Sequence, residues 1–322
     1  MPRVSFVVAA RNTERYVGDA IDSILSQTYD DLELIFVDDA STDATRRIVE
    51  ARKDPRIRII SGPGTGISSA SNVGICAARG EFVARLDADD VAEPDRVRQQ
   101  VEYFDSHPEV VLLGSWARLI ADDSTLVGEL RVPTDQRAVG AEVAAGRNPF
   151  LHPTVMFRRL EARTSGPFDA RMDGVGGEDA VFLHNLCRLG QAANLPLPLV
   201  RYRLARGAIS NGFSLLPTGL QRGRQRALQR VCLGAESVSD FETMRSVAAA
   251  ARAIDPELAY NYRVGKVLLE THGDPCLALR FLLKAWCLRP TSLRAQKNLL
   301  VAAARMFAKG HGRGTRTGKD PQ

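Results

Sequence analysis

The sequence lacks long apolar runs, paired cysteine motifs and histidine clusters. No apolar run among the 322 residues approaches the roughly 20 residues needed to cross a bilayer. The five cysteines are scattered and form no C-x-x-C pair, so reduced structural cysteines are expected and a zinc site is not. The N-terminal stretch MPRVSFVVAARNTERY reaches charged residues too soon for a signal peptide and has no small-residue cleavage site. These absences predict a cytoplasmic protein.

A glycine-rich phosphate loop is also missing after the first predicted strand. The segment AARNTERYV contains no glycine before Gly18, whereas a sugar-nucleotide pyrophosphorylase needs a glycine-rich basic loop there to hold a triphosphate. No G-x-G-x-x-G motif follows this strand, and GPGTG at residues 62–66 has the wrong spacing. The sequence therefore disfavours a pyrophosphorylase and a dinucleotide-dependent oxidoreductase.

Charge is distributed unevenly along the chain. The net charge is +5, yet residues 1–212 carry 25 Lys and Arg against 30 Asp and Glu, whereas residues 213–322 carry 18 against 8. This split predicts two regions with different surroundings. The basic C-terminal region suits an anionic membrane surface or a phosphate-bearing acceptor, and a solvated basic face explains it equally well. A nucleic-acid partner is not expected.

Strand and helix patterns alternate four times in the first 90 residues. The apolar runs typical of buried strands are VSFVVAA, LELIFVDDAS, RIRIISG and EFVARLDADD. Apolar residues at helical spacing follow each of the first three runs, so we expect a parallel α/β sheet with short connections. Asp38-Asp39 and Asp87-Asp89-Asp90 both follow strands, and ligands collect at the carboxyl ends of strands in such sheets.

The remaining chain is first mixed and then helical. Runs at 110–121 and 152–159 predict further strands, some of them antiparallel. After Phe213, Ala, Leu and Arg recur at helical spacing, and Pro256 and Pro290 are separated by 34 residues, the tetratricopeptide period. Helical hairpins are therefore expected. The predicted domains are an α/β domain at 1–212, a helical extension at 213–308 and a basic disordered tail at 309–322.

Asp87 and Asp89 form a D-x-D pair at the end of the fourth strand. Hard cations such as Mg²⁺ or Mn²⁺ take carboxylate oxygens and complete their ligand shell with substrate phosphates. Helix-capping aspartates in a surface loop would give the same D-x-D motif. A second acidic strand end earlier in the sheet favours a metal site instead. Asp39, at that earlier end, suits the reading of a nucleobase edge, because its carboxylate accepts from an N–H such as uracil N3–H.

Several ordered segments carry a family resemblance. They are VSFVVAARNTERYVGDAIDSILSQTYDDLELIFVDDASTDAT, GISSASNVGICAARGEFVARLDADDVAEPDRVRQQV, NPFLHPTVMFRR and GGEDAVFLHNLCRLG. Together they resemble family 2 glycosyltransferases with the GT-A fold, over residues 2–212 and not beyond. The resemblance implies a metal-dependent, inverting transfer of a sugar from a nucleotide-diphosphate donor, preferably a UDP-sugar, to an acceptor hydroxyl. Cell-surface glycan or polysaccharide synthesis is the implied setting.

The resemblance also implies roles for individual residues. Asp179 corresponds to the general base. His152 and Glu178 correspond to the acceptor side. Asp89, assisted by Asp87, corresponds to the metal ligand. The positions that correspond to the donor site are Ala10, Arg11, Asn12, Asp39, Gly66, Asn72 and Asp87.

Two departures from the family pattern affect the donor site. Ala9-Ala10-Arg11-Asn12 stands where the family often has Pro-x-Tyr-Asn, so Arg11 is expected to replace the stacking tyrosine. Tyr202-Arg203-Leu204-Ala205 stands where the family has YRxH, so the histidine that approaches the metal or diphosphate is absent. Arg203 or Arg206 could bind the diphosphate instead.

A second class of function remains open at this stage. A non-catalytic, transferase-like scaffold with a helical-repeat partner surface would share much of this sequence, although the intact Asp39, Asp87, Asp89 and Asp179 favour an enzyme. Peripheral contact with the inner face of a membrane and homodimerisation are equal expectations for the C-terminal helices. The acceptor is a glycan, a lipid-linked sugar or a polysaccharide, and the residues do not distinguish these.

Overall fold

The computed structural model describes residues 1–271 and 273–311, and these residues form two compact units. The first unit comprises Met1–Arg118, Glu129–Arg203 and Thr218–Ala248. The second comprises Leu119–Gly128, Leu204–Pro217 and the described part of Ala249–Gln322. The domain boundary at residue 212 stays a prediction. The composition assigns Thr218–Ala248 to the helical extension. In the structure, this segment packs with the first unit.

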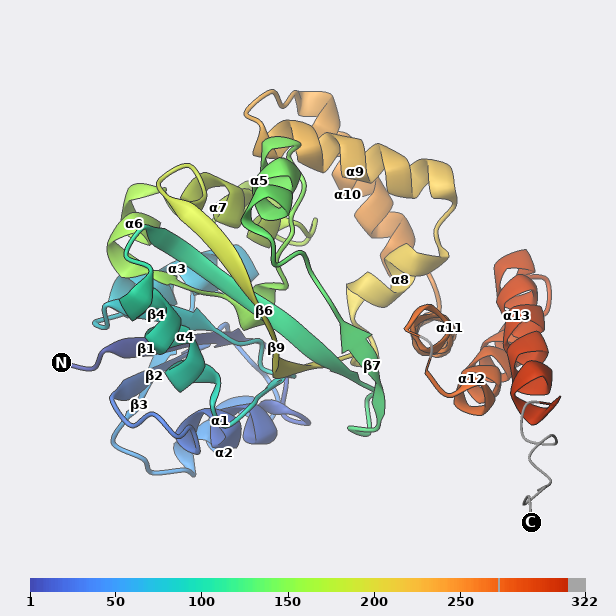
Figure 1. Cartoon of the computed structure of the whole chain (residues 1–322), viewed down its shortest axis with the longest axis horizontal. Helices are drawn as coiled ribbons and strands as arrows, with labels where there is room; N and C mark the ends of the chain where they lie inside the picture. The colour runs from blue at the N-terminus through green and yellow to red at the C-terminus, as the bar shows by residue number, and fades with distance from the viewer. Residues whose placement is uncertain (272, 312–322) are drawn as a thin grey trace, which may run out of the picture. The chain divides into compact units, whose positions relative to one another are not determined.

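A mixed sheet of nine strands, counted over the described residues, organises the first unit (Figure 1). The main order is β3-β2-β1-β4-β8-β6-β9-β5, and β7 pairs with β6 outside this order. The strands are β1 (Val4–Ala10), β2 (Leu32–Asp38), β3 (Ile57–Ser61), β4 (Phe82–Arg85), β5 (Val91–Ala92), β6 (Val110–Ile120), β7 (Leu126–Leu130), β8 (Met156–Arg158) and β9 (Gln191–Arg203).

The parallel half of the sheet brings the acidic strand ends together. β1 is parallel to β2 and to β4, in a register that pairs Ala10 with Asp38 and Val7 with Arg85. β8 then joins β4 in the antiparallel sense and also pairs antiparallel with β6. The predicted parallel sheet, extended by antiparallel strands, is confirmed. Because parallel strands end at the same edge, the residues that follow β1, β2 and β4 meet there.

Helices of the first unit cover both faces of this sheet (Figure 1). Alternate β1 side chains point to opposite faces, so Phe6 joins one apolar core with Ile21 and Ile24, whereas Val7 joins the other with Ala70. The helices are α1 (Val17–Leu25), α2 (Thr45–Glu50), α3 (Ile67–Ala77), α4 (Arg96–Ser106), α5 (Gln136–Ala144), α6 (Arg159–Thr164) and α7 (Glu178–Leu186). Short 3₁₀ helices span His152–Thr154 and Ala170–Met172.

A third apolar core explains why the first helices after residue 217 belong to the first unit. Helix α9 (Thr218–Cys232) contributes Leu228 and Val231 to a cluster with Met172, Val175 and Val181, from the segment around the start of α7. Helix α10 (Val238–Arg252) adds further apolar side chains to the same cluster. These helices therefore support the loop that carries the Glu-Asp pair.

The second unit is helical beyond its short connecting segments. Its helices are α8 (Ile209–Leu215), α11 (Pro256–Glu270), α12 (Pro275–Leu288) and α13 (Leu293–His311). The predicted helical hairpins are present, because α11 packs on α12 and α12 on α13. The first three residues of the predicted disordered tail belong to α13, and residues 312–322 lie outside the described residues.

Among residues 1–271 and 273–311, no helix combines the length and the apolar character needed to cross a membrane.

Close packing of α3 on the sheet gives a first prediction. A Cβ on Gly74 would collide with the Val7 side chain, whereas a Cβ on Gly140 of α5 would meet nothing within 4 Å. Gly74→Ala is expected to lower the free energy of unfolding by about 1–3 kcal/mol through overpacking. Gly140→Ala is expected to raise it by up to about 1 kcal/mol, because alanine favours the helix. Urea denaturation of both variants measures the difference; equal effects would contradict this packing.

Candidate active site

A cavity of about 560 Å³ opens at the carboxyl edge of the parallel strands. It is lined by polar and acidic side chains from the ends of β1, β2 and β4, from the start of α3 and from the loop before α7. The lining residues are Ala9, Ala10, Arg11, Thr13, Asp39, Thr65, Gly66, Ile67, Asp87, Ala88, Asp89, His152, Asp173, Gly174 and Glu178. Most of the site residues expected from the sequence therefore meet here.

Asp39 is held in the cavity wall by backbone amides of the following loop. The Gly64 N–H donates to its Oδ1 at 2.7 Å and the Gly66 N–H donates to its Oδ2 at 3.0 Å. Each oxygen keeps a further acceptor direction, because an ionised carboxylate has about four lone-pair sites. Glycine suits the loop, since Gly64 has a φ of +74° and Gly66 one of +139°. Asp39 is thus an anchored acceptor, and each of its oxygens has capacity for a further donor.

A fully buried guanidinium lies among the acidic residues. The Arg85 side chain, at the end of β4, donates to the Val7 carbonyl at 2.8 Å and to Asp87 Oδ1 at 3.2 Å. Burial lowers the pKa of Arg85 from its ordinary value, and the charges of Asp87, Glu178 and Asp179 oppose that shift. Arg85 is therefore the positive charge around which these carboxylates gather.

Asp89 and Asp90 follow Asp87 in the same loop, and their carboxyl charges are poorly compensated. Burial, and then the charge of Asp87, raises the pKa of Asp89 to about 7. Burial, and then the charges of Asp89 and Asp87, raise the pKa of Asp90 well above its ordinary value. Asp90 Oδ1 accepts from the Arg203 N–H at 2.7 Å, and the Arg203 guanidinium donates to the Asp89 carbonyl at 2.7 Å. Asp90 and Arg203 therefore fasten this loop to β9, while the Asp89 carboxyl faces the cavity.

Asp87 and Asp89 fit a hard divalent cation that brings further ligands with it. Within the described ranges, no three His, Cys, Asp or Glu side chains form a ready-made metal site. Both carboxylates line the cavity, and a positive charge there would favour the ionised form of Asp89, whose pKa burial raises. Oxygen ligands from phosphate and water complete such a shell in Mg²⁺ sites. The donor set present thus suits Mg²⁺ or Mn²⁺ bound together with a phosphate-bearing substrate.

The Glu-Asp pair begins helix α7, and its two members point differently. Glu178 lines the cavity, and burial followed by the charge of Asp179 raises its pKa to about 7. Asp179 lies outside the lining, and its Oδ2 accepts from Asn148 Nδ2 at 3.4 Å. Successive helical side chains diverge by about 100°, so adjacent residues cannot face the same point. Asp179 still acts electrostatically on Arg85 and His152.

His152 lies next to this cluster at the start of its 3₁₀ helix. Its Nε2 is 3.5 Å from Arg85 Nε, and its ring meets Phe168 edge-on at a centroid distance of 5.9 Å. Burial and then the Arg85 charge lower the pKa of His152. A neutral imidazole beside the cavity can accept or donate a hydrogen bond without adding charge.

The sequence reasoning missed Asp173. Its Oδ1 accepts from the Ser68 N–H at 2.7 Å and its Oδ2 from the Ser69 hydroxyl at 3.3 Å, so it caps α3 from a segment more than 100 residues away. Carboxylates at helix N-termini are stabilised by the free N–H groups and the helix dipole. No local motif signals this contact, because the cap comes from a distant loop. It ties the loop before α7 to the start of α3.

Other predicted site residues have structural partners. The Asn72 side chain donates to the Phe168 carbonyl at 3.0 Å and accepts from the Phe168 N–H at 2.7 Å, outside the cavity lining. Asn12 Oδ1 accepts from the Thr42 N–H at 2.8 Å. Arg206, offered as a diphosphate ligand, pairs instead with Asp122 and Glu257 in the second unit. Donor contacts of Asn72 and Asn12 stay predictions.

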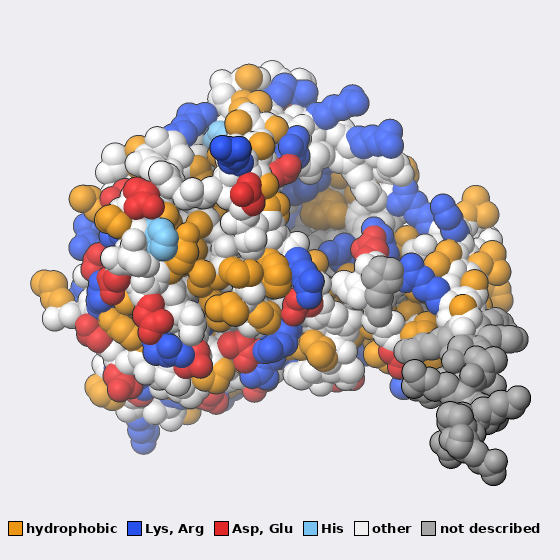
Figure 2. All heavy atoms as spheres, viewed as in Figure 1, with side chains coloured by type: hydrophobic (Ala, Val, Ile, Leu, Met, Phe, Trp, Pro, Cys, Tyr) orange, Lys and Arg blue, Asp and Glu red, His pale blue; other side chains and the backbone are white. Residues whose placement is uncertain are grey.

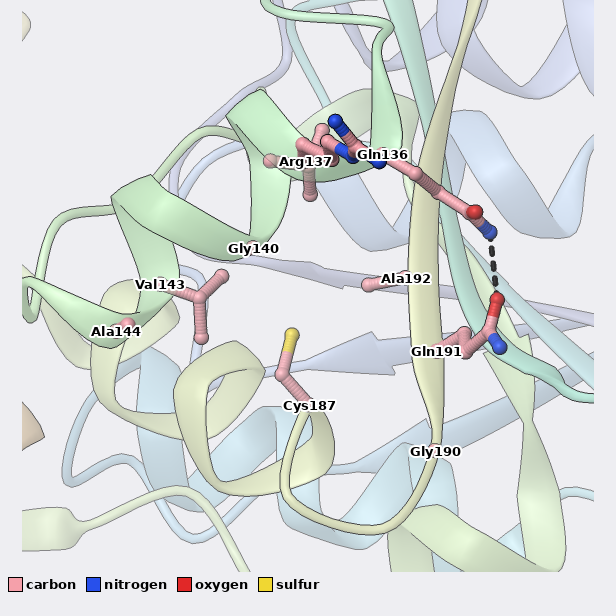
Figure 3. A pocket seen from close by; sticks show the side chains of 10 residues that line it. Gln136, Arg137, Gly140, Val143, Ala144, Cys187, Gly190, Gln191 and Ala192 are labelled. Carbon is pink, nitrogen blue, oxygen red and sulfur yellow. Dashed lines mark hydrogen bonds between the residues drawn. The ribbon is translucent and has the colours of Figure 1, made fainter.

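A separate cavity of about 460 Å³ lies between α5 and the start of β9 (Figure 3). Its walls include Val139, Val143 and Ala192, and Gln136 donates to Gln191 at 2.6 Å on its rim. Cys187 points into it, but burial raises the pKa of that thiol to about 12, so it is not a nucleophile near neutral pH. This cavity lacks the acid–base groups that the carboxylate cavity has.

Comparisons with known proteins agree with this geometry. The family model described as glycosyl transferase family 2 matches residues 5–163. An uncharacterised glycosyltransferase of Haemophilus influenzae is 31% identical over 223 residues, covering 63% of this chain and 66% of the relative. The succinoglycan biosynthesis protein ExoO of Rhizobium meliloti is 45% identical over 111 residues, covering 33% of this chain and 31% of the relative. The chain thus spans less than two thirds of these relatives' length.

Solved structures share the fold at low identity. S. aureus TarS 1-349 in complex with UDP-GlcNAc aligns with a TM-score of 0.56 and 17% identity, over 99% of this chain and 94% of that one. The mannosyltransferase PcManGT of Pyrobaculum calidifontis, in complex with GDP-Man and Mn²⁺, aligns with a TM-score of 0.55 and 20% identity, over 98% and 83%. The predicted GT-A fold is confirmed.

The raised pKa of Glu178 gives a prediction about stability. A carboxyl whose pKa is about 7 in the folded protein and ordinary in the unfolded chain holds its proton better when folded. Its contribution to stability is therefore lost as pH rises from about 4.5 to about 7. In metal-free protein, Glu178→Gln is expected to reduce that loss by about 1–2 kcal/mol.

Urea denaturation at a series of pH values measures this change. The exposed Glu242→Gln is the matched control and is expected to leave the pH dependence unaltered. An unchanged slope in Glu178→Gln would contradict the burial of this carboxyl.

Proposed function

The chain belongs to glycosyl transferase family 2, and we propose that it transfers a sugar from a UDP-sugar to an acceptor hydroxyl with inversion at the anomeric carbon. One observation carries the proposal: a single cavity joins an anchored aspartate, a D-x-D pair and the carboxylate of a Glu-Asp pair. The anchored aspartate suits a nucleoside, and the D-x-D pair suits a diphosphate with its cation. The carboxylate of the Glu-Asp pair suits an attacking hydroxyl.

Asp39 is proposed to read the base. Its two oxygens are fixed by the Gly64 and Gly66 amides, so a base N–H would meet an acceptor that needs no reorganisation. Arg11, whose Nη1 lies 3.4 Å from the Gly64 carbonyl, lines the same end of the cavity and offers a planar face for stacking. The complex of S. aureus TarS with UDP-GlcNAc supports uridine as the base.

Asp89 and Asp87 are proposed to hold Mg²⁺ or Mn²⁺ beside the donor diphosphate. When bound, such a cation neutralises the charge that develops on the departing nucleoside diphosphate. The Mn²⁺ in the complex of PcManGT with GDP-Man supports this use of metal. Arg85 holds Asp87 in place through the 3.2 Å contact, and Asp90 fixes the loop below.

The Glu-Asp pair is proposed to supply the base, with Asp179 in that role and Glu178 on the acceptor side. Asp179 takes this role after its side chain leaves Asn148 and turns toward the cavity. As the acceptor oxygen bonds to the anomeric carbon, the bond to the diphosphate breaks and the hydroxyl proton passes to the carboxylate. Glu178 and the neutral His152 line the cavity where the acceptor would enter.

Polysaccharide or cell-surface glycan synthesis is the proposed setting. The likeness of one third of the chain to the succinoglycan biosynthesis protein ExoO supports it. A transferase-like scaffold without catalysis is the competing proposal. The retention of five carboxylates in one cavity, two of them with pKa values raised to about 7, is costly for stability and favours an enzyme.

Amide variants of the two neighbouring carboxylates test this proposal. Asp179→Asn is expected to lower kcat by roughly 100- to 10,000-fold, because the acceptor proton loses its base. Glu178→Gln, the matched control, is expected to raise KM for the acceptor with a smaller effect on kcat. Release of UDP from UDP-sugars, measured with acceptor glycans and Mn²⁺, gives both parameters.

Full turnover in Asp179→Asn would refute the assignment of the base. Absence of any transfer or donor hydrolysis by the unaltered protein, across UDP-sugars and GDP-sugars, would favour the scaffold.

A further inference from the structure

Helix α13 exposes large apolar side chains to solvent and buries small ones. Its Ala295 and Ala302 are fully buried, whereas Leu293 is 78% exposed and Leu300 is 71% exposed. A helix that only completes a water-soluble core buries its large apolar residues and exposes its polar ones. The second unit therefore packs α13 through Ala295 and Ala302, with Leu299 and Met306 half-buried on the same side, and leaves Leu293 and Leu300 exposed.

The exposed positions of α13 lie on one face. Leu293, Lys297, Leu300, Val301 and Ala304 are all exposed, and they follow one another at helical spacings of three, four or one residues. At about 100° per residue, these five positions fall within an arc of roughly 100° on one side of the helix. The stripe is thus continuous along three turns, with a lysine between its leucines.

The end of α12 carries further exposed apolar side chains. Leu283, Trp286 and Leu288 are exposed by 40%, 36% and 51%, and α12 packs directly on α13. Within the described residues, six of the fourteen exposed large hydrophobic side chains fall between residues 283 and 301. Exposed apolar residues gathered in this way mark interaction surfaces, whereas scattered ones do not.

Charge on the same segment has a single sign. Residues 275–319 contain ten Lys and Arg and no Asp or Glu. Arg280 and Lys284 flank Leu283 on α12, and Arg289 is exposed in the turn to α13. Figure 2 shows hydrophobic and basic side chains next to each other over the C-terminal helices. We name as the docking face Leu283, Trp286, Leu288, Leu293, Leu300 and Val301 with Arg280, Lys284, Arg289 and Lys297.

We propose that the docking face binds the surface of an anionic lipid bilayer. Leucine and tryptophan side chains enter the boundary between headgroups and acyl chains, while lysine and arginine remain at the lipid phosphates. A second copy of the chain fits less well, because pairing this face with itself would juxtapose only positive charges. A nucleic acid would neutralise the charges but would leave the leucines in water.

This inference is independent of the proposed transferase reaction. The docking face lies wholly within the second unit, and every residue of the carboxylate cavity lies in the first. Membrane binding can therefore be measured without donor, acceptor or turnover.

Co-sedimentation of the full chain with vesicles tests the proposal. Vesicles of equal parts phosphatidylglycerol and phosphatidylcholine are expected to carry the protein down at low ionic strength, and pure phosphatidylcholine vesicles are not. Lys284→Glu/Lys297→Glu is expected to weaken the partition at least about tenfold, because each basic residue near an anionic surface contributes to binding. Added salt is expected to weaken binding by the unaltered protein.

The apolar part of the face is tested separately. Leu293→Ser/Leu300→Ser is expected to reduce binding at least about tenfold, since less apolar area enters the bilayer. Leu126→Ser/Leu160→Ser is the matched control: these leucines are 59% and 71% exposed outside the docking face, and binding should be retained. Circular dichroism confirms that all three variants keep their helices.

Three results would overturn the proposal. One is no sedimentation with anionic vesicles. Another is vesicle binding by Leu293→Ser/Leu300→Ser that equals binding by the unaltered protein. The interaction would then be charge attraction alone, which any polyanion, including a nucleic acid, would satisfy. The third is a dimer in light scattering that Leu293→Ser/Leu300→Ser dissociates, together with no vesicle binding, which would assign the face to a second copy.

Discussion

The arrangement of the acidic site in the first unit depends on the contacts of the buried Arg85 guanidinium. A charge without solvent is costly unless partners surround it, and Arg85 has the Val7 carbonyl, Asp87 and the more distant Glu178 and Asp179. These partners come from β1, from the loop after β4 and from α7. The Arg85 side chain therefore links the edge of the sheet to the acidic loop after β4 and, through charge, to the start of α7.

That arrangement leaves the cavity with more negative charge than the chain itself balances. Arg85 compensates Asp87, and Arg203 serves the backbone of Asp89, so the carboxyls of Asp89 and Glu178 keep pKa values of about 7. An additional cation would relieve the first, and a hydrogen bond donated by an acceptor hydroxyl would stabilise the ionised form of the second. The same electrostatic excess thus suits both ends of a transfer reaction.

The sequence predicted the sheet, and it placed Asp39 and Asp87 at the strand ends that line the cavity, because those features are local. Buried strands are recognisable in the sequence as apolar runs, and Asp39 and Asp87 directly follow two of these runs. It missed Asp173 and the role of Arg85, since both depend on contacts across the chain: one caps α3 from a distant loop, the other crosses from β4 to β1.

Composition was a weaker guide to the C-terminal region. The change at residue 213 reflects helical sequence, yet α9 packs on the loop before α7 through Leu228 and Met172. Apolar contacts between distant segments decide such grouping, and the periodicity of one helix does not reveal its partner. The unusual feature of α13 is likewise visible only in three dimensions, because its pattern does not say which side is buried.

Calorimetric titration of UDP, with and without Mn²⁺, tests the central claim most directly. The claim is that Asp89 and Asp87 bind the diphosphate through a cation. UDP is therefore expected to bind the unaltered protein at least about tenfold more tightly with Mn²⁺, a gain of roughly 1.4 kcal/mol, and Asp89→Asn is expected to abolish that gain. Equal affinity with and without the metal, or a metal effect that survives in Asp89→Asn, would contradict the account.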